Sequence, residues 1–201
     1  MWKNATSKLK SKNSPVLLTR HLKIFSHAMS LQHQSLFVKT VLRLTELREI
    51  TFHGLYWTDG LHSHLPKELE AVFANLTHLT LNRAYMGSPQ ELEQALSAFR
   101  SCRSLALFDI DWGYPQKTIS PKAFSKCLQD LSLSNMNPYP VIGSLVKGQA
   151  PFRLTRLTLQ SPVLHYVDEL VTVDVLLRPL QMTLSHLELG VSPDVMNKAR
   201  K

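Results

Sequence analysis

Nine histidines are the residues of this chain best suited to metal or proton chemistry. His21, His78 and His186 each stand one residue before a leucine that recurs at regular spacing, whereas His62 and His64 form an H-x-H pair. A zinc site needs at least three protein ligands, and the pair offers two. The other three are expected on strands one, three and seven of a sheet with strands about 4.8 Å apart. We therefore expect no metal site and interpret these histidines as surface residues.

Two aspartates are further candidates for chemistry, whereas motifs of nucleophilic catalysis are missing from the sequence. Asp109 and Asp111 flank Ile110, and paired carboxylates can transfer protons or bind Mg²⁺. More often, such a pair directly after a strand is a polar strand exit, that is, two solvated side chains at the place where the strand ends. The sequence holds no GxSxG, P-loop, GxGxxG or HExxH motif. We expect neither enzyme activity nor a cofactor.

The two cysteines and two of the tryptophans are the remaining candidate functional residues. Cys102 and Cys127 lack CxxC spacing and each precedes an apolar segment, so both are expected to be buried thiols. Trp57 and Trp112 each lie seven residues after a recurring apolar residue. They are candidates for a ligand platform, although aromatic residues matched between repeats more often pack in the turns.

The elements that position these residues come from a repeat with the pattern apolar-x-x-apolar-x-apolar. Six clear copies begin at Leu47, Leu76, Cys102, Leu128, Leu154 and Leu184, and a weaker first copy begins at Thr19. The central apolar residues are Leu22, Ile50, Leu79, Leu105, Leu131, Leu157 and Leu187, with spacings of 26–30 residues. Seven copies at this spacing predict stacked structural repeats.

Within each copy the period of two predicts a short strand whose central residue and the residue two later face the core. The intervening segments show helix signals, for example Ser88-Pro89 followed by helical apolar spacing. Helical segments are expected in residues 35–44, 66–73, 88–99, 120–124, 140–147 and 168–180. Alternating strands and helices predict an α/β fold, an irregular leucine-rich-repeat solenoid with a curved parallel sheet, outer helices and about seven repeats.

The candidate binding surface is the set of strand side chains that face away from the helices. It is small, polar and nearly uncharged, and we expect it to bind protein. By register, its protein-binding residues are Thr51, His53, His78, Thr80, Asn82, Ala106, Phe108, Ser132, Ser134, Arg156, Thr158 and Gln160, with Lys23 and Glu188 at the two ends.

The net charge of +8 belongs to the chain ends. Nine of the 23 basic residues lie in residues 1–23 and 196–201, which hold no acid, so 14 basic residues face 15 acidic ones between them. We divide the chain into a basic disordered tail (1–13), a repeat domain (14–195) and a second basic tail (196–201). The basic N-terminal arm leaves open an alternative function, the binding of nucleic acid or anionic membrane. A truncated chain without independent function is a further alternative.

The repeats resemble those of F-box and F-box-like proteins, especially the expanded fungal set. Leu76-Thr77-His78-Leu79-Thr80-Leu81 and residues 44–52 carry this resemblance, which covers about residues 16–192. It implies a substrate-capture role, as in ubiquitin ligase adaptors. No F-box is evident, because Leu65-Pro66 is followed too soon by the next strand. The asparagine expected five residues after each central residue is replaced by Leu55, Ala84, Ile110 and Met136. The turns are therefore expected to be irregular or packed by apolar contacts.

No signal-peptide pattern or apolar run of membrane-spanning length occurs in the sequence. We expect an intracellular protein, cytoplasmic or nuclear, with protein partners.

Overall fold

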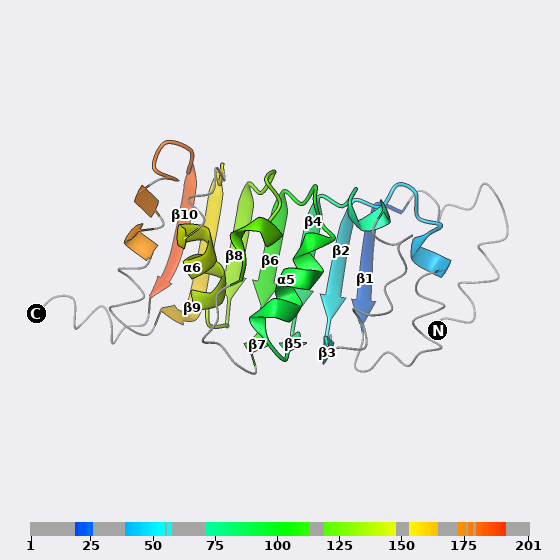
Figure 1. Cartoon of the computed structure of the whole chain (residues 1–201), viewed down its shortest axis with the longest axis horizontal. Helices are drawn as coiled ribbons and strands as arrows, with labels where there is room; N and C mark the ends of the chain where they lie inside the picture. Colours follow the sequence, from blue (N-terminus) through cyan, green and yellow to red (C-terminus); the bar gives the residue numbers. More distant parts are fainter. Residues whose placement is uncertain are drawn as a thin grey trace, which may run out of the picture.

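A seven-stranded sheet runs through the computed structural model. The structure describes residues 19–25, 39–54, 56–57, 71–112, 119–147, 153–164, 173–175, 177–178 and 180–191, so the two predicted basic tails lie outside it. All paired strands are parallel, in the order β1-β2-β4-β6-β8-β9-β10 (Figure 1). Their bounds are His21–Phe25, Glu49–His53, His78–Asn82, Ser104–Phe108, Asp130–Ser134, Arg156–Leu164 and His186–Val191.

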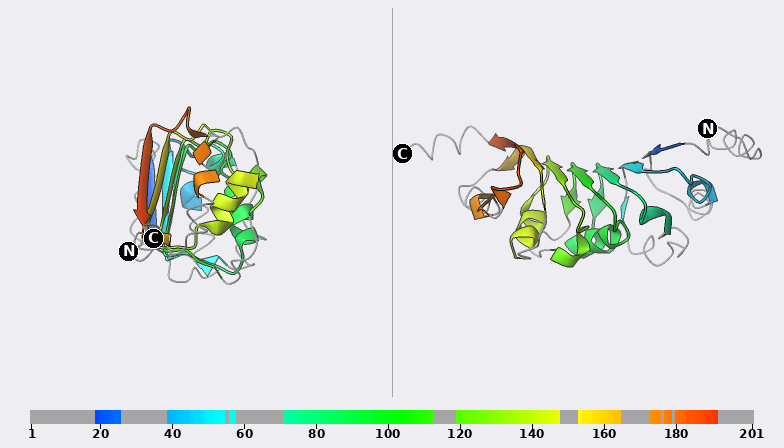
Figure 2. Two further views of the ribbon diagram at one scale, coloured as in Figure 1. Left: turned by 90° about the vertical axis from the view of Figure 1, so that its left-hand side faces the viewer. Right: turned by 90° about the horizontal axis from the view of Figure 1, so that it is seen from above.

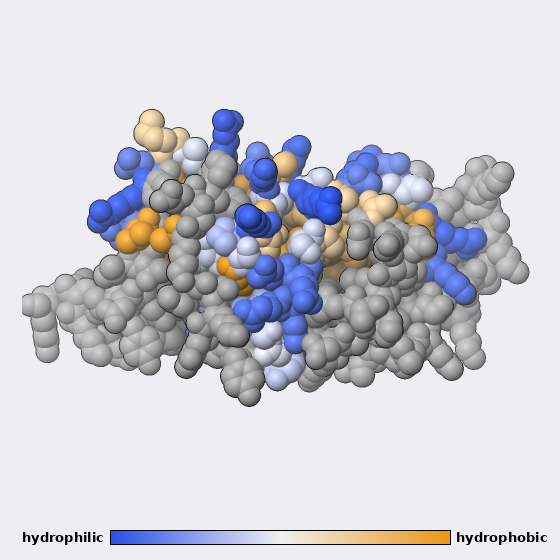
Figure 3. Space-filling view, in the orientation of Figure 1, coloured by the Kyte–Doolittle hydropathy of each residue, from blue (hydrophilic) through white to orange (hydrophobic). Residues whose placement is uncertain are grey.

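Among the described residues, helical segments cover one face of this sheet and none covers the other face. They include α5 (Pro89–Ser97), the 3₁₀ turn η2 (Pro121–Ala123) and α6 (Tyr139–Lys147). Seen from above in Figure 2, the sheet curves so that the helices lie on its convex side. Hydrophilic side chains gather over α5 on this outer side (Figure 3). The expected α/β solenoid is therefore confirmed.

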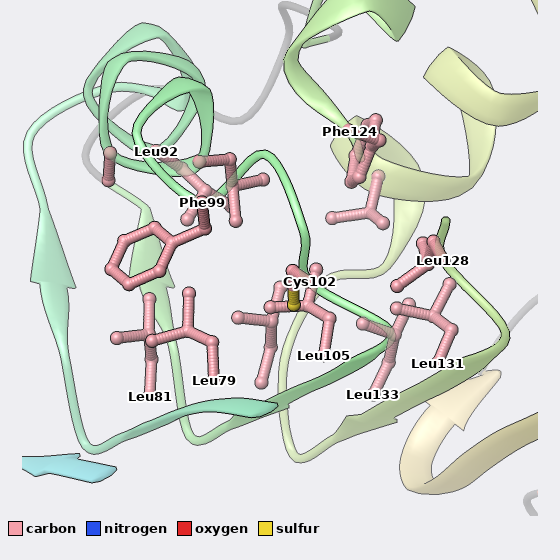
Figure 4. Close-up of a cluster of buried hydrophobic side chains, with 14 of the residues drawn as sticks. Leu79, Leu81, Leu92, Phe99, Cys102, Leu105, Phe124, Leu128, Leu131 and Leu133 are labelled. Carbon is pink, nitrogen blue, oxygen red and sulfur yellow. The ribbon is translucent and has the colours of Figure 1, made fainter. Parts of the chain in front are cut away.

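The predicted register is also confirmed. Leu22, Ile50, Leu79, Leu105, Leu131, Leu157 and Leu187 are direct partners across the seven strands. The residue two later in each strand forms a second row from Ile24 to Leu189. Leu79, Leu81, Leu105, Leu131 and Leu133 are buried, and Figure 4 shows them beneath Leu92, Phe99 and Phe124 from the outer segments. Because strands, helices and turns share one core, each repeat depends on its neighbours.

The helix α5 shows why the outer segments fold where the sequence predicts. Ser88 is extended, and Pro89 begins the helix with a backbone already suited to it. The Glu91 carboxylate accepts a hydrogen bond of 2.9 Å from the Gly87 N–H, which closes the helix start. The buried residues Leu92, Ala95 and Leu96 are spaced by three and four, so one face packs on the sheet.

The other expected helices are found in part. Residues 140–147 form most of α6, whereas residues 120–124 form only the short turn η2. Of the segments 35–44, 66–73 and 168–180, the described residues 39–41, 71–73, 173–175, 177–178 and 180 are helical, whereas residues 42–44 are not.

The turns after the strands are packed by apolar contacts. Ala84, Ile110 and Met136, which replace the expected asparagines, are buried in the core. Short strands follow, with β5 (Tyr85–Met86) placed between β3 (Tyr56–Trp57) and β7 (Asp111–Trp112) in a second parallel sheet. The apolar alternative for the turns is therefore the correct one.

A left-handed backbone recurs immediately before these apolar positions. Gly54, Arg83, Asp109 and Asn135 occupy the same place in four repeats, with φ between 52° and 66°. The N–H groups of the first three each donate a 2.9 Å hydrogen bond to a carbonyl of the next strand, at Asn82, Phe108 and Ser134. The last two strands are less regular, because β9 has nine residues and the pairing of β10 with β9 shifts in register between Leu189 and Val191.

The register makes a direct prediction for the two faces of β8. Leu131 is fully buried, so we expect Leu131→Ala to lower the free energy of unfolding by about 2–5 kcal/mol. Ser132 faces the opposite side and is half-buried, so Ser132→Ala should cost about 0.5 kcal/mol or less. Urea denaturation of both variants measures the difference, and equal losses would contradict the register.

The left-handed turns predict opposite effects for two substitutions. Gly54→Ala places a Cβ at φ 66° and should destabilise the protein by about 1 kcal/mol or more. Arg83→Gly removes a Cβ at φ 53° and should leave stability unchanged or raised. Thermal unfolding of the two variants checks this, and a loss of similar size in both would count against the turn geometry.

Candidate functional site

The uncovered side of the sheet carries three rows of side chains, which we call the concave face. Along each strand, residues alternate between the buried core and this face. The central row is Lys23, Thr51, Thr80, Ala106, Ser132, Thr158 and Glu188. The first row is His21, Glu49, His78, Ser104, Asp130, Arg156 and His186. The third row is Phe25, His53, Asn82, Phe108, Ser134 and Gln160.

All twelve residues predicted for protein binding therefore share one surface. Their neighbours in each row lie on adjacent parallel strands, about 4.8 Å apart. From β2 to β9 the central row consists only of threonine, serine and alanine. Such short side chains leave the middle of the face shallow, so a partner can approach the sheet closely.

The first row contains a cluster that the sequence reasoning missed. Glu49 lies between two histidines, with 3.7 Å from its Oε2 to His21 Nδ1 and 3.9 Å from its Oε1 to His78 Nδ1. His21 Nε2 also lies 3.3 Å from Thr51 Oγ1. Compared only with one another, the histidines lie on separate strands and indicate no cluster. The missed signal is that Glu49 holds the same repeat position as both histidines.

This cluster is partly exposed and its chemistry is that of a hydrogen-bonding surface. The side chains of His21, Glu49 and His78 are each between 43% and 50% exposed. Among the described residues, no group of three or more histidine, cysteine or acidic side chains is placed to hold a metal ion. His62 and His64 lie outside the described residues.

An aromatic pair lies at the N-terminal end of the third row. The rings of Phe25 and His53 stack with centroids 4.7 Å apart and planes inclined by 11°. Phe25 is 71% exposed, which is unusual for a large apolar side chain on a folded sheet. Phe108 lies further along the same row and is half-buried. These rings provide the apolar contact area that the central row lacks.

The C-terminal half of the concave face is polar and charged. Gln160 Nε2 donates a 2.8 Å hydrogen bond to Glu188 Oε1. Asp130 accepts a hydrogen bond of 3.3 Å from the Thr155 hydroxyl, and Arg156 is its register partner. Across the described strands the face carries two basic and three acidic side chains, Lys23, Arg156, Glu49, Asp130 and Glu188.

The paired aspartates, Asp109 and Asp111, lie in the turn region after β6. Asp109 lies 3.6 Å from Arg83 Nε and accepts a 2.8 Å hydrogen bond from Asn135 Nδ2. These three side chains belong to the left-handed positions of successive repeats, so they link the turns laterally. Asp111 lies in β7 and is exposed. The interpretation of the pair as a polar strand exit agrees with this placement.

The two tryptophans also belong to the turn layer. Trp57 and Trp112 flank Met86 as its register partners in the small sheet, and Met86 is fully buried. Their backbone placement agrees with aromatic residues matched between repeats rather than with a site on the concave face.

The cysteines differ, and the expectation for Cys127 was wrong. Cys102 is buried, and its thiol donates a 3.2 Å hydrogen bond to the Ser104 carbonyl. Burial raises the pKa of the Cys102 thiol from 9.0 to about 11. Cys127 is exposed, because Leu128 holds the core position that Cys102 holds in its own repeat.

Comparison with known proteins adds little to this geometry. No protein-family model matches the chain, and no curated protein matches it. One solved structure with a similar fold is a tropomodulin C-terminal domain from Caenorhabditis elegans. It has a TM-score of 0.44 and 8% sequence identity over 90% of this chain and 92% of that one. Within the described residues, no helix is long and apolar enough to cross a membrane.

The two cysteines should differ in reactivity. In the folded protein we expect an aromatic disulfide reagent at neutral pH to modify Cys127 rapidly and Cys102 only after denaturation. Because the pKa of Cys102 is higher in the folded than in the unfolded state, its stabilising contribution is complete below pH 9 and is lost as the pH rises through about 11. Rapid modification of both thiols in the folded protein would contradict the burial of Cys102.

Proposed function

We propose that this chain is a protein-recognition module that binds its partner on the concave face. The observation that carries the proposal is the row arrangement, which brings twelve side chains, all polar or small except Phe108, from five strands onto the concave face. Repeat solenoids commonly use such surfaces, because every repeat adds one strand to a continuous binding area.

The charge of this face favours protein over nucleic acid. Nucleic-acid binding surfaces gather lysine and arginine to neutralise several phosphates. The described part of the concave face instead has two basic and three acidic side chains, and the two basic ones, Lys23 and Arg156, lie on β1 and β9. A mixed, nearly neutral surface suits a partner that brings its own hydrogen-bonding groups and side chains of both charges.

The layout of the face suggests how a partner would bind. The stacked Phe25 and His53 supply an apolar anchor at one end, and aromatic anchors contribute much of the affinity in protein interfaces. The cluster around Glu49 and the pair of Gln160 and Glu188 supply directional hydrogen bonds on either side of the shallow centre. The groups at the two ends of the concave face would then determine specificity, and the short side chains at its centre would let the partner approach the sheet closely.

The resemblance to F-box repeats extends the proposal. In that family the repeats capture the substrate, while a separate F-box docks to the ubiquitin ligase. By that resemblance, the partner of this chain is a protein captured for further processing.

A central substitution tests the binding surface. We expect Thr80→Arg to weaken capture of the partner at least about tenfold, because a long charged side chain obstructs the shallow centre. Gln94→Arg is the matched control, since it adds the same charge to an exposed position of α5 on the opposite side. Affinity purification of the tagged chain from its native cell extract identifies the partner, and titration with the purified partner gives the affinities.

The same binding experiment distinguishes the concave face from the basic N-terminal arm as the binding site. Deletion of residues 1–13 should leave the interaction intact if the concave face binds the partner. Loss of a salt-sensitive interaction in the deletion, with no effect of Thr80→Arg, would instead assign binding to the basic arm. Circular dichroism of each variant shows that the fold is retained.

A further inference from the structure

The C-terminal edge of the sheet leaves core residues uncovered. Leu187 and Leu189 of β10 are register partners of Leu157 and Leu159, which are fully buried. Leu187 is nevertheless 42% exposed and Leu189 is 38% exposed. Their side chains face the core layer, so this exposure arises because no described strand covers them from the far side of β10.

Further apolar side chains lie near this edge. The helical residues 173–175 and 177–178 lie beside β10 (Figure 1), and Val175 among them is 42% exposed. Met182, in the turn that leads into β10, is 89% exposed. Leu187 and Leu189 form the apolar end surface of the sheet, and Val175 and Met182 are further exposed apolar side chains of the same repeat. Exposed apolar clusters of this kind often mark protein interfaces.

The strand at the opposite edge of the sheet, β1, keeps its core residues covered. In β1, Ile24 occupies the repeat position of Leu189 but is only 2% exposed, and Leu22 is partly buried against the core. Head-to-tail stacking of two copies would need apolar surfaces at both ends. Because, of the two edges in the described part of the chain, the C-terminal one exposes its core residues, the surface that matches it best is the same surface on another copy.

We propose that β10 pairs antiparallel with β10 of a second copy, about a two-fold axis at Leu187. The His186 N–H donates a 3.1 Å hydrogen bond to the Thr155 carbonyl that precedes β9. Since backbone groups alternate in direction along a strand, the N–H and C=O groups of Leu187 and Leu189 point to the open edge. They can therefore bond to the same groups of the second copy.

Opposite charges favour this register. With the axis at Leu187, Leu187 of one copy lies opposite Leu187 of the other copy on the core side. On the concave face, His186 then lies opposite Glu188 of the partner strand, and the pair occurs twice. An axis at Glu188 would oppose two carboxylates, which destabilises cross-strand pairing. Two side chains of β9 face this His186–Glu188 pair. Arg156 is the register partner of His186, and Gln160 donates a hydrogen bond to Glu188, so neither brings a second carboxylate close to Glu188.

The dimer would join two sheets into one and would set both concave faces on the same side. A two-fold axis perpendicular to the sheet relates antiparallel neighbours, so the core sides also coincide. This arrangement concerns the edge of the sheet and does not depend on what the concave face binds.

Sedimentation of the full chain over a wide concentration range tests the proposal. We expect a reversible monomer–dimer equilibrium. Leu187→Arg should weaken dimerisation by about tenfold or more. Leu42→Arg is the matched control, because Leu42 is 39% exposed but lies in the repeat before β2; it should leave the equilibrium unchanged.

A charge exchange tests the register. His186→Glu should weaken the dimer by opposing Glu188 of the second copy, and the double variant His186→Glu with Glu188→His should restore it. The proposal is overturned by a wild-type chain that stays monomeric, by growth into larger oligomers, or by a dimer that is indifferent to Leu187→Arg or to the charge exchange. A monomer that dimerises only after deletion of residues 192–201 would assign the apolar end to that segment and would also overturn it.

Discussion

The packing of each leucine row against the rows beside it is the interaction on which the rest of this structure depends. A single repeat has too few apolar neighbours to bury its own side chains. In the central strands, Leu79, Leu105 and Leu131 are covered by neighbouring repeats and by the outer segments, and burial of each contributes roughly 1.5–3 kcal/mol. The same residue position at the last described strand, Leu187, has a described neighbour on one side only, Leu157, and is exposed.

This stacking also determines what the opposite side can do. Because the strands pair without slippage from β1 to β9, every second side chain falls into a straight row on the concave face. A helical surface would distribute the same residues around its axis, whereas the sheet aligns them. The lateral contact of Glu49 with two histidines, like that of Asp109 with Asn135, follows from this alignment.

Much of this arrangement could be predicted, because apolar periodicity reports directly which residues face the core. The central residues, the register and α5 follow from it. The left-handed turns were not predicted, although Gly54, Asp109 and Asn135 are residue types that favour a positive φ; only Arg83 gives no sign of it. Cys127 was misjudged because a shift of one residue changes the side chain from core to solvent. The Glu49 cluster required comparison of different residue types at one repeat position.

The most direct test of the account is a pair of double-cysteine variants in a Cys127→Ser background. Ala106→Cys with Ser132→Cys joins register partners on the concave face, at the spacing of about 4.8 Å that a disulfide accepts. Ala106→Cys with Ser134→Cys keeps the same face but offsets the partners by two residues. The account predicts rapid oxidation to an intramolecular disulfide in the first variant only. Equal cross-linking in both, or none in the first, would contradict the register on which the concave face depends.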